Sequence, residues 1–239
     1  MPWVYLQCSG RKHMSLLWHK KKLKEALLKL TNEPTTIITD LFIAIFGFYF
    51  AHFLQTLYYN SQMEVHKYFS LYFLSIAIGA SFGSVYHAVE TKFYNFRSGL
   101  WKMIMICMVL SSVTLLLAII FFSISSNDNS QKFLQILSYS VLFFSTIKIF
   151  YNDDIKNAAI IYCPISIISA VVMFLSWYHN SNMDAKQIFV GLIISLFGTS
   201  FVFTRISLHK HFNHNDLFHV FQIIGMYFIF VGSIKILDF

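Results

Sequence analysis

The amino-acid sequence predicts an all-α, polytopic integral membrane protein with seven transmembrane helices, preceded by a basic amphipathic helix. Of the 239 residues, 56% are hydrophobic and only 12% are charged, whereas soluble domains carry about 25% charged residues. Seven apolar segments each approach the roughly 20 residues that a helix needs to cross a bilayer. The chain has only three prolines and nine glycines, which favours uninterrupted helices over the broken helices of many transporters.

Residues 1–34 are expected to form a cytoplasmic segment that contains the basic helix. Its apolar residues share one helical face and its lysines supply the charge: Leu16, Leu23, Leu27, Leu30, Lys20, Lys21, Lys22, Lys24 and Lys29. Over residues 14–30 this pattern predicts an amphipathic helix lying on an anionic leaflet. A second interpretation stays open, in which the lysines act only as a positive topology signal.

Residues 35–239 are expected to form one seven-helix transmembrane domain. Polar connections separate the apolar segments and place the helices at 36–58, 68–89, 101–123, 133–151, 158–178, 187–206 and 216–236. The three cysteines form no CxxC pair, so neither a disulfide framework nor a thiolate zinc site is expected. The formal charge of +7 lies largely beside the first apolar segment, which favours membrane lipids over nucleic acid as the partner.

The distribution of lysine and arginine predicts the orientation of the helices. Fourteen of the 18 such residues fall in the N-terminal segment and in the connections on its side of the membrane. Because positively charged loops resist translocation, the N-terminus is expected in the cytoplasm and the C-terminus on the opposite side.

Ionisable residues stand at the cytoplasmic ends of three predicted helices. With this topology, Asp40, His87 and the stretch from His214 to His219 all lie at that side, although the topology rests on lysine and arginine alone. We therefore expect one shared site. Asp216 and His219 are three residues apart and face the same way. Together with His87 they would supply three metal ligands and leave a fourth zinc position for water.

Further residues have expected roles around this metal. Ser84, one turn before His87, is expected to hydrogen-bond a bound water or a developing oxyanion. Asp40 is expected to orient a histidine or to act as a general base. Plainer interpretations remain open: Asp40 and Asp216 as carboxylates that stabilise a helix start, and His87 as a histidine at the membrane boundary.

Two short motifs resemble those of a known family. The segment Gly83-Ser84-Val85-Tyr86-His87 resembles the Ser-x-x-Tyr-His pattern of the progestin and adipoQ receptors, and Asn215 to Val220 resembles their last-helix His-x-x-x-His pattern. These receptors belong, with alkaline ceramidases and Per1-like proteins, to the CREST superfamily of seven-helix membrane hydrolases. The resemblance implies zinc at the cytoplasmic side, His87 and His219 as ligands, and hydrolysis of lipid amides.

This chain departs from the family pattern at two places. Asn215 occupies the position of the first last-helix histidine, so Asp216 would be the third ligand, with His214 or Asn215 as substitutes. The family's third-helix aspartate has no counterpart between Gly99 and Phe122.

The sequence therefore predicts a membrane hydrolase that acts on a lipid amide or ester through zinc or another divalent metal near the cytoplasmic leaflet. The alternative is a non-enzymatic seven-helix receptor or transporter with a buried cluster of aspartate and histidine.

Overall fold

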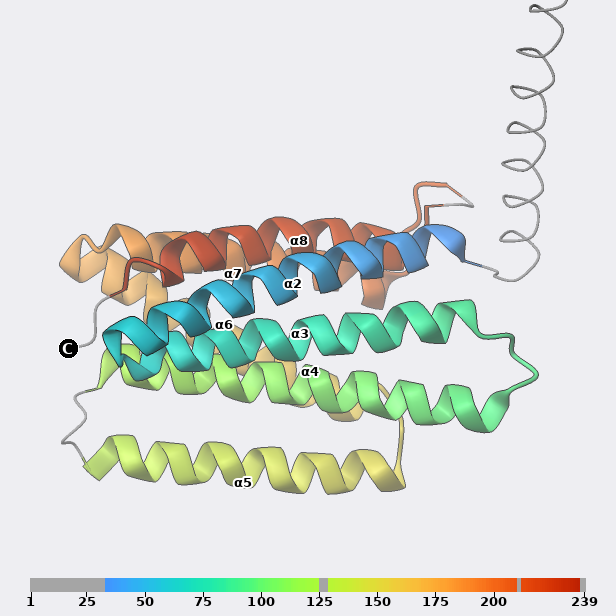
Figure 1. The fold of residues 1–239 in the computed structure, drawn as a ribbon, viewed down its shortest axis with the longest axis horizontal. Coiled ribbons are helices and arrows are strands. Elements are labelled where there is room, and N and C mark those ends of the chain that lie inside the picture. Colours follow the sequence, from blue (N-terminus) through green and yellow to red (C-terminus); the bar gives the residue numbers. More distant parts are fainter. Residues whose placement is uncertain (1–32, 125–128, 210–211, 237–239) are drawn as a thin grey trace, which may run out of the picture.

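The computed structural model describes residues 33–124, 129–209 and 212–236, and these residues form seven α-helices, α2 to α8 (Figure 1). The helices are α2 (Pro34–Ser61), α3 (Glu64–Ala88), α4 (Tyr94–Ser123), α5 (Asn129–Tyr151), α6 (Lys156–Asn180), α7 (Met183–Thr204) and α8 (His214–Ser233). Each is long and apolar enough to cross a membrane. The predicted seven-helix architecture is confirmed at this level, and the amphipathic helix expected over 14–30 lies outside the described residues.

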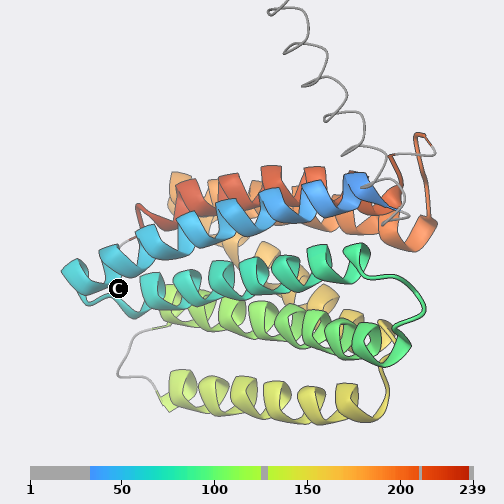
Figure 2. The ribbon, with the colours of Figure 1, turned by 45° about the vertical axis from the view of Figure 1, so that its right-hand side comes forward.

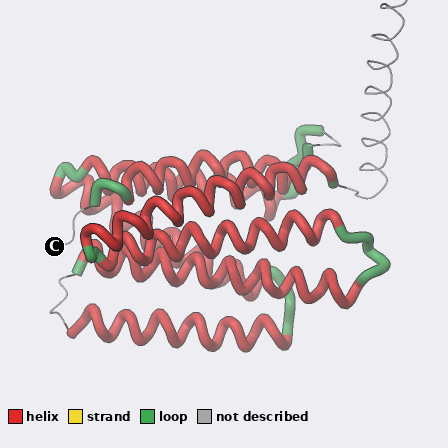
Figure 3. Tube along the Cα trace, in the orientation of Figure 1, coloured by secondary structure: helices red, strands yellow, loops and turns green. Residues whose placement is uncertain are grey.

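Each helix begins before the apolar segment that predicted it, whereas α3, α7 and α8 end before their predicted segments do. α4 begins at Tyr94 rather than at residue 101, and α3 begins at Glu64 rather than at residue 68. Hydropathy marks only the residues suited to a hydrocarbon core, whereas backbone hydrogen bonds continue each helix into its polar flanks. The connections stay short, so consecutive helices run antiparallel, as the tube in Figure 3 shows.

Six of the helices close a ring and α5 stands outside it. α2 packs along α3, α3 along α4, α4 against α6, α6 along α7, α7 along α8, and α8 returns to α2. α5 contacts α4 and touches α6 only slightly, and both ribbon views place it at the edge of the bundle (Figures 1 and 2). The ring brings the first and last described helices side by side.

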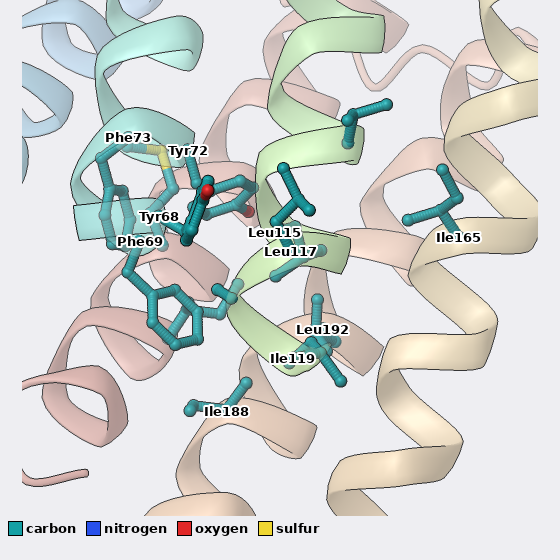
Figure 4. Packing of buried hydrophobic residues seen from close by; sticks show 14 of the residues in the cluster. Tyr68, Phe69, Tyr72, Phe73, Leu115, Leu117, Ile119, Ile165, Ile188 and Leu192 are labelled. Atoms are coloured by element: carbon teal, nitrogen blue, oxygen red, sulfur yellow. The ribbon is translucent and has the colours of Figure 1, made fainter. Parts of the chain in front are cut away.

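Aromatic rings hold together the three helices that build the site described below. Phe50 of α2 stacks on Phe230 of α8 with ring centroids 4.2 Å apart, and meets the edge of Phe73 of α3 at 5.3 Å. Figure 4 shows Phe69, Tyr72 and Phe73 of α3 in the packed interior beside leucines of α4. Such aromatic pairs contribute about 0.5–1.5 kcal/mol beyond the area that they bury.

The outer surface of the bundle is rich in large apolar side chains. On α5, Phe133, Ile136 and Phe144 are 65%, 66% and 67% exposed. Hydroxyl groups within the helices donate to their own backbone: Ser75 Oγ to the Leu71 carbonyl and Ser138 Oγ to the Leu134 carbonyl, both at 2.7 Å. Bonds of this kind satisfy polar groups without water, and an apolar exterior of this extent suits hydrocarbon surroundings.

Candidate functional site

The polar site lies at the end of the bundle where α2 begins, α3 ends and α8 begins. Because helices alternate in direction, these three ends share one side of the molecule (right-hand side of Figures 1 and 2). The ring places α2 between α3 and α8, so polar side chains from all three helices converge around the first turns of α2.

The centre of the site is a contact between Asp40 and His219. Asp40 Oδ1 of α2 lies 3.4 Å from His219 Nε2 of α8. Both residues are buried, with 4% and 7% of their surfaces exposed. The sequence predicted that the ends of these two helices meet, and the structure brings the two side chains together.

A threonine orients the other side of the His219 ring. Thr39 Oγ1 lies 2.7 Å from His219 Nδ1, and the same hydroxyl is placed to donate to the Thr36 carbonyl at 3.1 Å. Thr39 Oγ1 carries one hydrogen. When that hydrogen goes to the Thr36 carbonyl, Nδ1 of His219 is the donor to Thr39. Nε2 then presents a lone pair to the Asp40 carboxyl group, and either a proton on that carboxyl group or a cation between the two atoms would complete the contact.

A glycine lets α3 approach the Asp40 carboxyl group. A Cβ atom at Gly83 would lie 2.8 Å from Asp40 Oδ2 and 3.0 Å from Oδ1. No described residue donates a hydrogen bond to Oδ2. Ser84 is buried beside this contact, on the α3 side of the site, and its role as a water or oxyanion partner stays a prediction.

His87 does not join Asp40 and His219 directly but contacts Glu33, a residue that sequence reasoning missed. Glu33 Oε2 lies 2.9 Å from His87 Nδ1, without a well-aligned hydrogen bond. The contact with the His87 ring is the main cause that holds the pKa of Glu33 below its ordinary value, against the opposing effect of burial. His214 and Asn213 act on Glu33 in the same direction. Its position just before Pro34, at a helix start, was the available signal.

The two carboxyl oxygens of Asp216 have different surroundings in this structure. Oδ2 accepts a hydrogen bond from the Asn213 backbone at 2.8 Å, while Asn213 Oδ1 accepts from the backbones of Asn215 and Asp216 at 2.8 and 3.3 Å. This reciprocal arrangement is a capping box, so the plainer interpretation of Asp216 as a helix-start residue is confirmed for Oδ2. Oδ1 is buried and has no hydrogen-bond partner among the described residues. The Asn-x-x-Asp spacing was the signal for Asn213.

The charges at this end are closely spaced. Glu33 and Asp216 both lie within electrostatic range of Asp40, and His87 lies within that range of His219. Three carboxyl groups therefore lie near the imidazoles of His87 and His219 in a region that is largely buried. Such an arrangement favours a bound cation or shared protons. Among the described residues, however, no three His, Cys, Asp or Glu side chains are arranged closely enough to hold a metal ion.

Comparison with known proteins addresses the family but not the activity. Residues 35–238 match the profile of a family of unknown function, DUF6962. The chain belongs to this family. The match spans all seven helices, so the family domain is the whole helical bundle with the polar site at its end. No curated protein sequence matches the chain.

Proposed function

We propose that the chain is a multi-pass membrane hydrolase that uses zinc or another divalent metal at the Asp40 and His219 site to cleave a lipid amide or ester. The observation that carries the proposal is the geometry between His219 Nε2 and Asp40 Oδ1. Their separation of 3.4 Å exceeds the roughly 2.7–3.2 Å of ordinary hydrogen bonds. Two ligands at about 2.0–2.1 Å from a tetrahedral zinc ion lie about 3.3–3.4 Å apart.

The surroundings of His219 fit the role of a metal ligand. A histidine that binds a metal through one nitrogen usually donates its other N–H to an oxygen, which fixes the tautomer. Thr39 Oγ1 stands 2.7 Å from Nδ1 for this purpose. This assignment makes Asp40 a ligand rather than the base or orienting group expected from sequence.

The remaining ligands would come from residues that already surround this pair. Asp216 Oδ1 is buried and unpartnered among the described residues and lies within electrostatic range of Asp40, but its side chain would have to move toward the pair to bind the same ion. His87 would have to turn from Glu33 to join. A bound zinc ion would supply a water with a pKa near 7 as the nucleophile. Ser84 would hydrogen-bond that water or the developing oxyanion.

The substrate class and the orientation rest on sequence. The resemblance to CREST hydrolases supports a lipid amide or ester, and the exposed apolar surface suits acyl chains. The excess of lysine and arginine on one side supports a cytoplasmic N-terminus. Labelling with a membrane-impermeant thiol reagent tests the orientation in a cysteine-free background. A cysteine at Asn60 should label from outside intact cells and one at Asn152 only after lysis; the reverse pattern would overturn the orientation.

A second candidate is a receptor or transporter in which a proton, not a metal, lies between His219 and Asp40. The observation that favours it is that the described residues offer no ready group of three metal-binding side chains. One Asp216 oxygen is also engaged in the cap of α8. A proton on the imidazole or on the carboxyl group would bridge His219 Nε2 and Asp40 Oδ1 as a metal ion would. Buried ionisable groups in membrane helices commonly take part in proton transfer.

Metal analysis of the purified protein separates the two candidates. We expect about one zinc or other divalent ion per chain in the wild type and its loss in the His219→Ala and Asp40→Asn variants. His52→Ala is the matched control, because His52 is an exposed histidine of α2 distant from the site. It should retain the metal. Equal, negligible metal in wild type and variants would refute the hydrolase proposal and leave the proton candidate. Release of fatty acid from ceramide by the loaded protein tests the activity itself.

A further inference from the structure

A second group of polar side chains lies deeper in the bundle and begins one turn beyond His219. Gln222 follows His219 by three residues on the same face of α8. It pairs with the Tyr72 hydroxyl of α3, and further hydroxyl groups of α6 and α7 lie nearby, none of which carries a charge. We define this neutral polar group as Tyr72, Tyr162, Ser166, Ser169, Ser195, Thr199 and Gln222.

Members of the neutral polar group on four helices lie close to one another. The Tyr72 hydroxyl of α3 pairs with the side chain of Gln222, and Tyr162 of α6 is its electrostatic neighbour. Thr199 Oγ1 of α7 lies 3.5 Å from the Tyr162 hydroxyl, and Ser166 pairs with the same hydroxyl. The result is two neighbouring sets of polar side chains, Tyr72 with Gln222 and Tyr162 with Thr199 and Ser166, inside an otherwise apolar bundle.

Three oxygen atoms of the neutral polar group have no hydrogen-bond partner among the residues that the structure describes. Gln222 Oε1, Ser195 Oγ and Ser169 Oγ form no hydrogen bond with any described residue, although their residues are only 6%, 3% and 0% exposed. Helical spacing puts Ser195 one turn from Thr199 and Ser169 one turn from Ser166. Each orphaned group would cost about 1–3 kcal/mol if it stayed unpaired.

The chemistry of these three oxygen atoms indicates which kind of molecule would supply their missing hydrogen bonds. No carboxylate or imidazole belongs to the neutral polar group, so it lacks the charge to hold a metal ion, and an acyl chain offers no hydrogen bonds. A water molecule donates and accepts, and buried waters commonly make about three hydrogen bonds to otherwise unsatisfied polar atoms. We propose that the neutral polar group is a hydration site, which holds ordered water in the interior of the bundle one helical turn beyond His219.

This inference is independent of whether a metal or a proton lies between Asp40 and His219. In either case the unpartnered oxygen atoms of the neutral polar group need hydrogen bonds from elsewhere, because both ring nitrogens of His219 are engaged by Thr39 and Asp40. Gly225 reinforces the arrangement, because a Cβ atom there would overlap Ser195 Oγ. Ser195 of α7 therefore packs closely against α8 at Gly225, one turn after Gln222.

Radiolytic hydroxyl-radical footprinting of the intact protein in ¹⁸O-labelled water tests the proposal. Radicals form on bound water and modify the side chains beside it, so Tyr72 should be labelled several times faster than its neighbour Phe73, after correction for intrinsic reactivity. Phe73 is the dry reference, since it is fully buried on the same helix. Labelling of Tyr72 at the rate of Phe73 would overturn the proposal.

Two variants tie the labelling to the neutral polar group. Gln222→Met keeps the side-chain length without the amide and should slow labelling of Tyr72 several-fold. Gln131→Met is the matched control, because Gln131 is also a buried glutamine but donates to the Ile124 carbonyl, away from the neutral polar group. This variant should leave the rate of Tyr72 labelling unchanged. Ser195→Ala is a smaller change that reports if Gln222→Met does not fold. If Gln222→Met folds and does not slow the labelling of Tyr72, the hydration site is refuted. If it does not fold, the same conclusion follows from a Ser195→Ala variant that does not slow the labelling.

Discussion

Replacement of Gly83 by alanine tests how closely α3 approaches the site. The new Cβ atom would lie 2.8 Å from Asp40 Oδ2, so the carboxyl group must move by about 0.6 Å to reach ordinary contact near 3.4 Å. Overpacking of this kind costs about 1–3 kcal/mol. Metal ligands tolerate only about 0.2 Å of displacement. Gly83→Ala should therefore lower the free energy of unfolding by about 1–3 kcal/mol and reduce any metal affinity by about 10- to 100-fold.

Unfolding in mixed detergent micelles and metal titration measure these two effects separately. Gly99→Ala is the control, since a Cβ atom there meets nothing within 4 Å. It should leave the metal affinity unchanged and stabilise the protein by up to about 1 kcal/mol, as alanine is the better helix former. If Gly83→Ala were as stable as Gly99→Ala, Asp40 would not pack against Gly83, and the close approach of α3 would be wrong.

Three further predictions concern the surroundings of the site. The contact with His87 lowers the folded-state pKa of Glu33 below 4.5, so its contribution exists above pH 4.5 and is lost as the pH falls through the folded pKa. The wild type should be more stable than the Glu33→Gln variant by at most about 1 kcal/mol, because the pair is partly exposed. The difference between their Tm values should shrink below pH 4.5, and a difference that does not change with pH would refute the contact. Asn213→Ala removes the cap of α8 and should cost about 0.5–2 kcal/mol in chemical unfolding, whereas Asn213→Ser keeps a neutral capping oxygen and should cost much less, and equal losses would argue against capping. Gly225→Ala should separate α7 from α8, because its Cβ would overlap Ser195 Oγ, and should lower the Tm by more than any of these changes; a wild-type Tm would exclude the close helix contact.

The residues of the candidate site were found from sequence to different degrees. Asp40 and His219 were found because ionisable groups are rare in apolar segments, and the alternating direction of the helices put both at one end. Glu33 was not found, because an acid outside the apolar segment looks like any solvated charge. Asn213 was overlooked although its spacing to Asp216 is that of a capping box.

The choice of partners depended on how the helices pack. From sequence, His87 belonged with His219, and Asp40 was a secondary group. In the structure Asp40 contacts His219, and His87 contacts Glu33 instead. A helix can rotate about its axis without changing its hydropathy, so the pattern along the chain does not fix which polar side chains face each other. Close approach at glycines such as Gly83, and the Phe50 and Phe230 stack, set those rotations.

The sequence by itself determined that this protein has seven helices suited to a membrane, the approximate position of each, and that Asp40, His87 and His219 lie toward the same end of the bundle. These properties follow from local hydropathy and from the alternation of direction between short connections. Only the tertiary structure decided that α2 returns to α8, that α5 stands apart, and that an aspartate and a histidine 3.4 Å apart form the centre of the site. Those contacts join residues distant in the chain, and side-chain packing across several helices selects them.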